Sequence, residues 1–171
     1  VQLELPVIER LAHFTEHRQI AALSARFAAV VNLEARLAAL GAIHRGVGVA
    51  GHVHVGDYVI VGGNSGIHQF CKIDSYSMIG GASLIVKDVP AYVMVSGNPA
   101  HAFAMNVEGM RRKGWSKNVI QGLRTAFKLI YKEGLTTEQA LERIRAEILP
   151  EVAEVQLLID SLEQSERGIV R

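Results

Sequence analysis

The chain has 171 residues and a nearly balanced charge, with 18 Lys and Arg against 17 Asp and Glu. This length suits one or two structural units, and the charge balance argues against nucleic-acid binding and against a strongly acidic partner. Cys71 is the single cysteine, so no disulfide forms within the chain. The sequence shows neither a signal peptide nor an apolar run that could span a bilayer, so we expect a cytoplasmic protein without a transmembrane segment.

The first forty residues differ in composition from the rest. All sixteen glycines lie at or after Gly41, and Ala, Leu, Arg and Glu dominate before it. Residues 19–40 are predicted to form a helix because apolar side chains recur there at helical spacing: Leu23, Phe27, Val30, Leu37 and Leu40. Val31 and Leu37 also keep the phase of the repeat that follows, so a degenerate coil of that repeat stays open as an alternative.

A six-residue repeat begins at Ile43. A branched aliphatic residue occupies every sixth position without a break: Ile43, Val49, Val55, Val61, Ile67, Ile73, Ile79 and Ile85. This spacing matches neither an amphipathic helix nor a half-buried strand. It predicts a parallel β-helix with triangular coils of eighteen residues, in which one aliphatic per side points inward and each coil packs on its neighbours. Glycine follows the aliphatic residue at positions 56, 62 and 80, where we expect the chain to turn a corner.

Residues 86–100 are predicted to end this repeat. Pro90 and Pro99 remove hydrogen-bond donors and should stop regular strand pairing. Residues 116–134 then predict a helix that begins after the N-cap candidate Ser116 and ends at glycine. Its apolar face is formed by six residues at helical spacing: Val119, Ile120, Leu123, Phe127, Ile130 and Tyr131.

Two further helices are expected after this one. A capping-box pattern from Thr136 to Gln139 opens the first, and Pro150 suits the first turn of the second, which runs toward Gly168. The predicted fold class is therefore mixed β/α, with a parallel β-helix of hexapeptide repeats followed by an α-helical C-terminal domain. Its three parts are a non-repeat helical segment, the β-helix and the helical domain: 1–42, 43–100 and 101–171.

Five segments carry a family resemblance. "GHVHVGDYVIVGG", "IHQFCKI", "KDVPAYVMVSGNPA", "MNVEGMRRKGWS" and "LRTAFKLIYKEG", in this order, resemble the bacterial UDP-N-acetylglucosamine O-acyltransferase family over residues 49–171. Hexads alone indicate only a large acyltransferase superfamily, whereas the HQF and VEGMRRKG motifs are more specific. The resemblance implies a left-handed β-helix and a homotrimer with active sites between subunits. It also implies transfer of a 3-hydroxyacyl chain from acyl carrier protein to the 3-hydroxyl of UDP-N-acetylglucosamine, the first step of lipid A synthesis, without cofactor or metal.

His68 and Gln69 are the first candidate site residues. They follow the inward Ile67 and should point outward, and the resemblance places them at the nucleotide sugar. His68 could assist proton transfer there, since an imidazole titrates near neutral pH. His52, sixteen residues before His68, should lie on the neighbouring coil, and it matches a cleft histidine of the family. His54 has no such match and is interpreted as a surface residue.

The segment after the repeat supplies the remaining candidates. By resemblance, Asn106, Glu108 and Arg112 bind the substrate, and the Arg112 guanidinium can grip a phosphate through two parallel hydrogen bonds. Lys113 stands where family members often carry arginine, which weakens the case for a second bidentate contact. Gly81 matches a position in the acyl groove where glycine leaves room for a long chain. Cys71 is interpreted as a packing residue.

One departure from the family concerns the catalytic base. Family members place a histidine nineteen residues before the position of His52, and this chain has Leu33 there. A leucine cannot accept a proton, so the usual base is absent unless His44, His17 or another group replaces it. Residues 1–42 are interpreted either as a diverged or fused segment or as the truncated or out-of-frame product of a family gene.

Three functions therefore remain open from the sequence. The first is an acyltransferase that is slow because its base is missing. The second is a non-catalytic trimeric scaffold that binds the sugar nucleotide. The third, a β-helical carbonic anhydrase, needs three imidazoles around one metal ion. It is disfavoured because no close pair of histidines recurs at the spacing of a coil.

Overall fold

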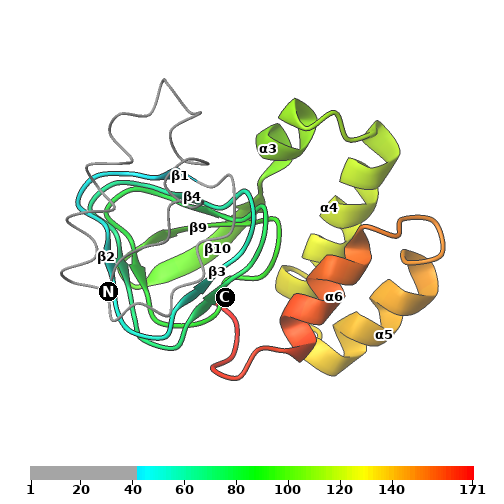
Figure 1. Cartoon of the computed structure of the whole chain (residues 1–171). Coiled ribbons are helices and arrows are strands. Elements are labelled where there is room, and N and C mark those ends of the chain that lie inside the picture. Colours follow the sequence, from blue (N-terminus) through cyan, green and yellow to red (C-terminus); the bar gives the residue numbers. More distant parts are fainter. Residues whose placement is uncertain (1–41) are drawn as a thin grey trace, which may run out of the picture.

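The computed structural model describes residues 42–171, so Leu33 and the helix predicted at 19–40 lie outside the described residues. Figure 1 shows a triangular β-helix with a group of helices packed beside it. No helix within the described range combines the length and the apolar character needed to cross a membrane.

Short parallel strands build the three faces of the β-helix. Ala42 pairs with Ile60 and Ile60 with Met78, so one coil takes eighteen residues, as predicted. One face consists of β1, β4 and β7, the second of β2, β5 and β8, and the third of β3 and β6. The strands are β1 Ala42–Ile43, β2 Gly48–Val49, β3 His54–Val55, β4 Ile60–Val61, β5 Gly66–Ile67, β6 Lys72–Ile73, β7 Met78–Ile79 and β8 Leu84–Ile85.

Two rows of side chains fill the inside of the coils. The predicted aliphatic row points inward, and from Val49 onward its members are buried. A second row, two residues earlier in each hexad, also points inward and consists of valine, serine and cysteine: Val47, Val53, Val59, Ser65, Cys71, Ser77, Ser83 and Val89. On each side of the triangle, two buried residues flank one outward residue. The buried side chains are aliphatic or small, so they fill the inside of the coils without large aromatic rings.

The corners differ from the prediction. The glycines at 56, 62 and 80 do not adopt positive φ; the residue two positions later in the hexad does. The corner residues with φ between 56° and 65° are His52, Tyr58, Asn64, Phe70, Tyr76 and Ala82. This conformation is unusual for bulky residues. Here the N–H of a corner residue donates to the coil before it, as from Tyr76 to the carbonyl of Asp57 at 2.8 Å.

The glycines after the aliphatic residues serve a close approach between coils instead. A Cβ on Gly56 would lie 2.6 Å from the backbone nitrogen of Ser75 on the next coil, and one on Gly80 would lie 2.8 Å from Cβ of Ser96. Neither distance is tolerated by real side chains. Glycine is therefore required at these positions by packing rather than by backbone conformation.

Strand pairing continues past the two prolines, contrary to the prediction. β9 Val93–Gly97 pairs in parallel with β7, and β10 Ala100–Met105 pairs antiparallel with β9. Pro99 lies in the tight connection between these strands, where no ladder donor is needed. The sheet thus extends to Met105, five residues beyond the expected boundary at 100.

The C-terminal part consists of α3 Val107–Arg112, α4 Lys117–Tyr131, α5 Thr137–Glu147 and α6 Val155–Glu163. Ser116 caps α4, and Thr136 and Gln139 form the capping box of α5, as predicted. The short helix α3 was not predicted. Pro150 does not begin the last helix, because it lies in a turn and α6 starts at Val155. The N-cap residue of α6, Glu154, makes no capping hydrogen bond with its side chain.

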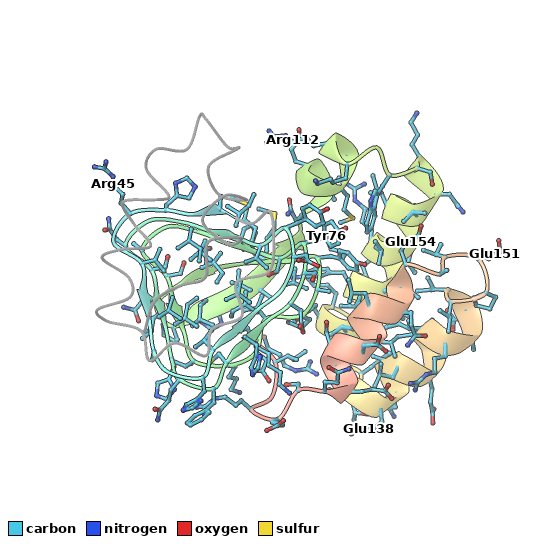
Figure 2. The ribbon with its side chains drawn as sticks, viewed as in Figure 1. Arg45, Tyr76, Arg112, Glu138, Glu151 and Glu154 are labelled. Carbon is cyan, nitrogen blue, oxygen red and sulfur yellow. The ribbon has the colours of Figure 1, made fainter. Side chains whose placement is uncertain are left out.

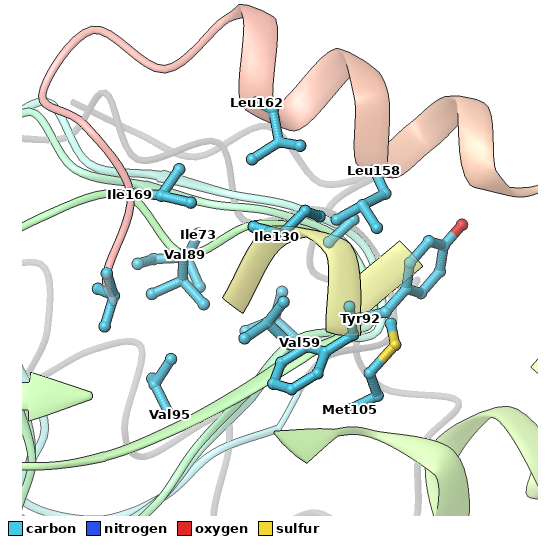
Figure 3. Close-up of a cluster of buried hydrophobic side chains, with 14 of the residues drawn as sticks. Val59, Ile73, Val89, Tyr92, Val95, Met105, Ile130, Leu158, Leu162 and Ile169 are labelled. Atoms are coloured by element: carbon cyan, nitrogen blue, oxygen red, sulfur yellow. The ribbon is translucent and has the colours of Figure 1, made fainter. Parts of the chain in front are cut away.

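The helices share one apolar core with the last coils (Figure 3). Leu158 and Leu162 of α6 face Ile73 and Val89 of the β-helix, and Ile130 of α4 lies in the same cluster. The ring of Tyr92 is buried there, and its hydroxyl donates to the carbonyl of Glu154 at 3.1 Å. This core fixes the helical part relative to the coil corners.

Candidate functional site

The corner between β5 and β6 carries His68 and Gln69. Both side chains are exposed, as expected for residues that follow the inward Ile67. The backbone N–H of His68 donates to the carbonyl of Ile85 on the next coil at 2.8 Å. Nδ1 of His68 lies 3.1 Å from the carbonyl oxygen of Gln69. A rigid backbone thus presents an imidazole and an amide side by side.

His52 lies at the same corner, one coil earlier. Its ring stacks on that of Phe70, with centroids 5.0 Å apart and planes 2° from parallel. Phe70 is half exposed. The sequence interpretation placed His52 on the coil next to His68 but overlooked Phe70, although Phe70 stands one full coil after His52. This corner therefore joins two imidazoles, an amide and an exposed aromatic ring, and His54 is exposed on the adjoining face.

A second corner, between β6 and β7, is covered by the segment that directly follows α3. Tyr58, Tyr76 and Tyr92 stack along successive coils, with centroid distances of 4.8 and 5.6 Å. Trp115 packs against Tyr76 and Tyr92, and the ammonium of Lys113 lies 3.8 Å from the centroid of the Tyr58 ring. Lys113, for which the sequence made a second bidentate contact doubtful, thus makes a cation–π contact within the chain.

Arg112 projects from α3 beside the corner that carries Tyr76 (Figure 2). Its Nε donates to Oε1 of Glu108 at 3.2 Å, and Arg111 approaches the other carboxylate oxygen at 3.9 Å. The side chains of Arg112 and Glu108 are 75% and 63% exposed. Such an exposed pair contributes little to stability, about 0–1 kcal/mol. The guanidinium can therefore exchange Glu108 for an anionic ligand at low cost.

Asn106 differs from the other candidates because it is buried, with 5% of its surface exposed. Its Oδ1 accepts from the N–H of Gly109 at 3.0 Å, and its Nδ2 donates to the carbonyl of Tyr76 at 2.9 Å. Both ends of the amide are thus bound within the chain.

Gly81 lies at the third corner, between β7 and β8, in register with Gly63 and Arg45 on the preceding coils. It is exposed, and a Cβ placed on it would meet only the backbone of Gly63, with the carbonyl oxygen at an ordinary 3.4 Å. A side chain at this position would therefore project outward. His44 directly follows β1 and begins the same corner two coils earlier. It shares the hexad phase of His68 but lies on a different edge of the triangle.

The candidate residues thus occupy three separate corners of one chain. His52, His68 and Gln69 lie at the first, Arg112 at the second and Gly81 at the third. Since the packed interior of the β-helix separates the corners, the fold of a single chain keeps the His68 corner apart from Arg112 and from Gly81.

Two further features that could carry chemistry are the thiol of Cys71 and clusters of metal-binding side chains. Cys71 is fully buried, and this burial raises the pKa of its thiol to about 11. Across residues 42–171, no group of three or more His, Cys, Asp or Glu side chains is arranged to hold a metal ion.

Comparison with known proteins identifies relatives of this region. Residues 88–170 match the family described as "Udp N-acetylglucosamine O-acyltransferase; Domain 2". The acyl-[acyl-carrier-protein]--UDP-N-acetylglucosamine O-acyltransferases of Stutzerimonas stutzeri and Ectopseudomonas mendocina are 50% and 51% identical over 123 residues. These alignments cover 72% of this chain and 47% of each relative. The chain therefore spans about half the length of the curated relatives that it matches.

Solved structures agree with the sequence comparison. LpxA of Acinetobacter baumannii is 81% identical with a TM-score of 0.73, over 74% of this chain and 49% of that one. UDP-N-acetylglucosamine O-acyltransferase of Moraxella catarrhalis is 57% identical with the same TM-score, and the coverage of both chains is also the same.

Proposed function

Because this chain belongs, over its described residues, to the UDP-N-acetylglucosamine O-acyltransferase family, we propose that it acts on UDP-N-acetylglucosamine and an acyl carrier protein. The reaction is transfer of a 3-hydroxyacyl chain to the 3-hydroxyl of the sugar, which begins lipid A synthesis. The observation that carries the proposal is the corner where His68 and Gln69 face solvent beside the His52–Phe70 stack. This corner supports the proposal because an imidazole and an amide are exposed there side by side, next to a second imidazole.

At that corner, Gln69 and His52 hold the sugar, while His68 assists transfer of the proton from the sugar hydroxyl. The sugar oxygen attacks the thioester carbonyl, a carbon–oxygen bond forms, and the carbon–sulfur bond breaks. The proton of the hydroxyl passes to the departing thiolate, so that the carrier leaves as a thiol. A positioned imidazole can relay this proton because its two nitrogens exchange donor and acceptor roles near neutral pH.

Arg112 binds the diphosphate in this proposal, in place of its partner Glu108. Guanidinium and phosphate geometries match for two parallel hydrogen bonds, and the exposed ion pair with Glu108 is weak enough to be exchanged. Glu108 released from Arg112 can then accept from a donor on the nucleotide. Gly81 leaves the third corner open for the acyl chain, and its open surroundings support this role.

The separation of these residues over three corners supports a homotrimer. If one site needs His68, Arg112 and the groove at Gly81, it must combine corners of different copies, because one chain keeps them apart. The interface between copies would also cover exposed apolar side chains near the corners, including Phe70 and Leu84. A cytoplasmic location stays a prediction from the sequence.

Turnover by this chain is expected to be slow. A positioned general base contributes about 100- to 10,000-fold, and Leu33 stands where the family has its base histidine. His44 lies at the Gly81 corner rather than the His68 corner, so it does not replace the base within its own chain. The non-catalytic scaffold is therefore the second candidate function.

A transfer assay with labelled 3-hydroxyacyl carrier protein separates the two candidates. The acyltransferase predicts labelled sugar nucleotide that forms slowly and is lost in His68→Ala, with Asn118→Ala as the exposed control. The scaffold predicts saturable binding of UDP-N-acetylglucosamine without product. Absence of both binding and product would overturn the proposed function.

A mixing experiment tests whether sites are shared between copies. His68→Ala and Arg112→Ala chains are each expected to bind the sugar nucleotide poorly. When the two are unfolded together and refolded, mixed assemblies regain intact sites only if His68 and Arg112 come from different copies. Binding that stays at the level of the separate variants would contradict the shared site.

A further inference from the structure

Helix α3 has only six residues, from Val107 to Arg112. A helix this short is unstable by itself in water, so contacts outside the helix must hold it in place. We propose that Asn106 is a positioning residue that pins α3, and with it Arg112, to the corner at Tyr76, and that Gly109 is its required steric partner. The functional part of this inference rests on the proposed role of Arg112 in binding the sugar nucleotide.

Three hydrogen bonds of Asn106 connect α3 to the β-helix. Its Oδ1 caps the helix by accepting from the N–H of Gly109 at 3.0 Å, while its Nδ2 donates to the carbonyl of Tyr76 at 2.9 Å. Its backbone N–H donates to the carbonyl of Tyr92 at 2.7 Å. One residue therefore joins the first turn of α3 to two successive coils. Its amide is buried and makes one hydrogen bond at each end within the chain.

Gly109 is shaped to the Asn106 side chain. A Cβ on Gly109 would lie 2.5 Å from Nδ2 and 2.7 Å from Oδ1 of Asn106, closer than real atoms approach. Glycine is otherwise a poor choice inside a helix, less favourable than alanine by about 1 kcal/mol. The close fit to Asn106 explains why this short helix contains one. Any side chain at 109 would push the amide out of place without removing a polar group.

The far end of α3 is held by aromatic contacts to the same corner. Trp115 follows the helix, its backbone N–H donates to the carbonyl of Met110 at 3.2 Å, and its ring packs on Tyr76 and Tyr92. Lys113 lies over the Tyr58 ring. Asn106 at the start and Trp115 at the end thus determine where the intervening Arg112 emerges.

Trp115 is the single tryptophan of the chain, so its fluorescence reports the placement of α3. The main variant is Gly109→Ala, which displaces the Asn106 amide but removes no group that could touch a ligand. Asn106→Ala removes the pin itself. Thr136→Ala is the matched control, because it removes a comparable side-chain cap from α5, a different helix.

We expect Gly109→Ala and Asn106→Ala to shift Trp115 emission to longer wavelength and to increase its quenching by acrylamide. Both variants should bind UDP-N-acetylglucosamine about 10- to 100-fold more weakly, the size of a lost charge-assisted bond. These measurements are made at a temperature where circular dichroism shows the coils folded. Thr136→Ala should lower the unfolding temperature but leave emission and affinity unchanged. In an Arg112→Ala background, Gly109→Ala should cause no further loss of affinity.

Each contrary result has a distinct meaning. Wild-type emission and quenching in Gly109→Ala would overturn the pinning of α3. Shifted emission with unchanged affinity would overturn its connection to Arg112. Weaker binding by Asn106→Ala with unchanged Trp115 emission would show a direct ligand contact and would also overturn the proposal. If the wild-type chain does not bind the nucleotide, the proposed function fails, while Trp115 emission still decides whether Asn106 positions α3.

Discussion

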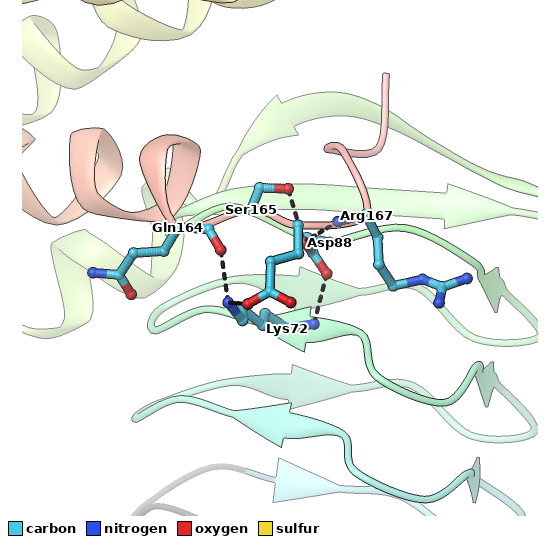
Figure 4. A network of polar contacts seen from close by, with 6 residues as sticks. Lys72, Asp88, Gln164, Ser165 and Arg167 are labelled. Carbon is cyan, nitrogen blue, oxygen red and sulfur yellow. Dashed lines mark hydrogen bonds and ion pairs between the residues drawn. The ribbon is translucent and has the colours of Figure 1, made fainter.

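The backbone N–H of Lys72 donates a 2.8 Å hydrogen bond to the carboxylate of Asp88, sixteen residues later in the chain (Figure 4). The second oxygen of Asp88 accepts from the hydroxyl of Ser165 at 2.7 Å and from the N–H of Arg167. Asp88 is buried, and its backbone pairs with the segment 164–170 through Gly168 and Val170. One carboxylate therefore attaches the C-terminal segment to the last coil.

Asp88→Ala should destabilise the protein by about 3 kcal/mol. It leaves the partly buried N–H of Lys72 and the hydroxyl of Ser165 without their acceptor, and charge-assisted bonds contribute about 1.5–3 kcal/mol each. Urea unfolding measures the loss. Asp57→Ala, which removes an exposed aspartate, is the control and should change stability by less than about 0.5 kcal/mol. Equal losses in the two variants would show that Asp88 does not attach the segment.

Gly56→Ala should destabilise the β-helix by about 1–3 kcal/mol, the usual range for overpacking. Its Cβ would lie 2.6 Å from the nitrogen and the hydroxyl oxygen of Ser75, and the coil backbone cannot move away alone. Gly51→Ala is the matched control because a Cβ at this position would have no atom within 4 Å. Thermal unfolding compares them. A Gly56→Ala variant as stable as Gly51→Ala would contradict the requirement for close coil contact.

Asp74 should make stability depend on pH. Burial raises its pKa above the ordinary value of 3.8, although a hydrogen bond with Ser161 acts in the opposite direction. Because the folded state then holds the proton more tightly than the unfolded chain, stability falls as pH rises from 3.8 toward the raised pKa. Asp74→Asn removes this dependence, so the variant should gain stability relative to wild type over that interval. Urea unfolding at several pH values tests this, and a constant difference would refute it.

Cys71 should resist modification in the folded protein. Its thiol is buried and its pKa is raised to about 11 by desolvation, so about one thousandth of it is thiolate at pH 8. We expect iodoacetamide to label the native protein far more slowly than the urea-unfolded chain. Mass spectrometry measures the extent of labelling over time. Rapid labelling of the native form would show that the coil opens or that the thiol is activated.

Local sequence patterns were sufficient to predict the repeating part of the fold. The aliphatic period from Ile43 to Ile85 predicted the coil length because every inward position obeys the same local geometry. Ser116 and Thr136 marked helix starts correctly because a cap acts within one turn. Pro150 and Pro99 were misinterpreted, since a proline ends pairing or starts a helix only in certain surroundings. The pairing of β9 with β7 depends on the coil before it, which no local pattern records.

Sequence motifs also indicated which residue types are available for chemistry, because His52, His68, Gln69 and Arg112 lie in recognisable motifs. The folded structure was needed to show that His52, His68 and Gln69 share one corner of the triangle while Arg112 lies apart from them on α3. It was likewise needed to show that Asn106 is buried and caps α3, with its amide bonded to Gly109 and Tyr76. The physical reason is that burial and hydrogen-bond partners arise between residues far apart in the chain, such as Asn106 and Tyr76, whereas a motif describes only neighbours.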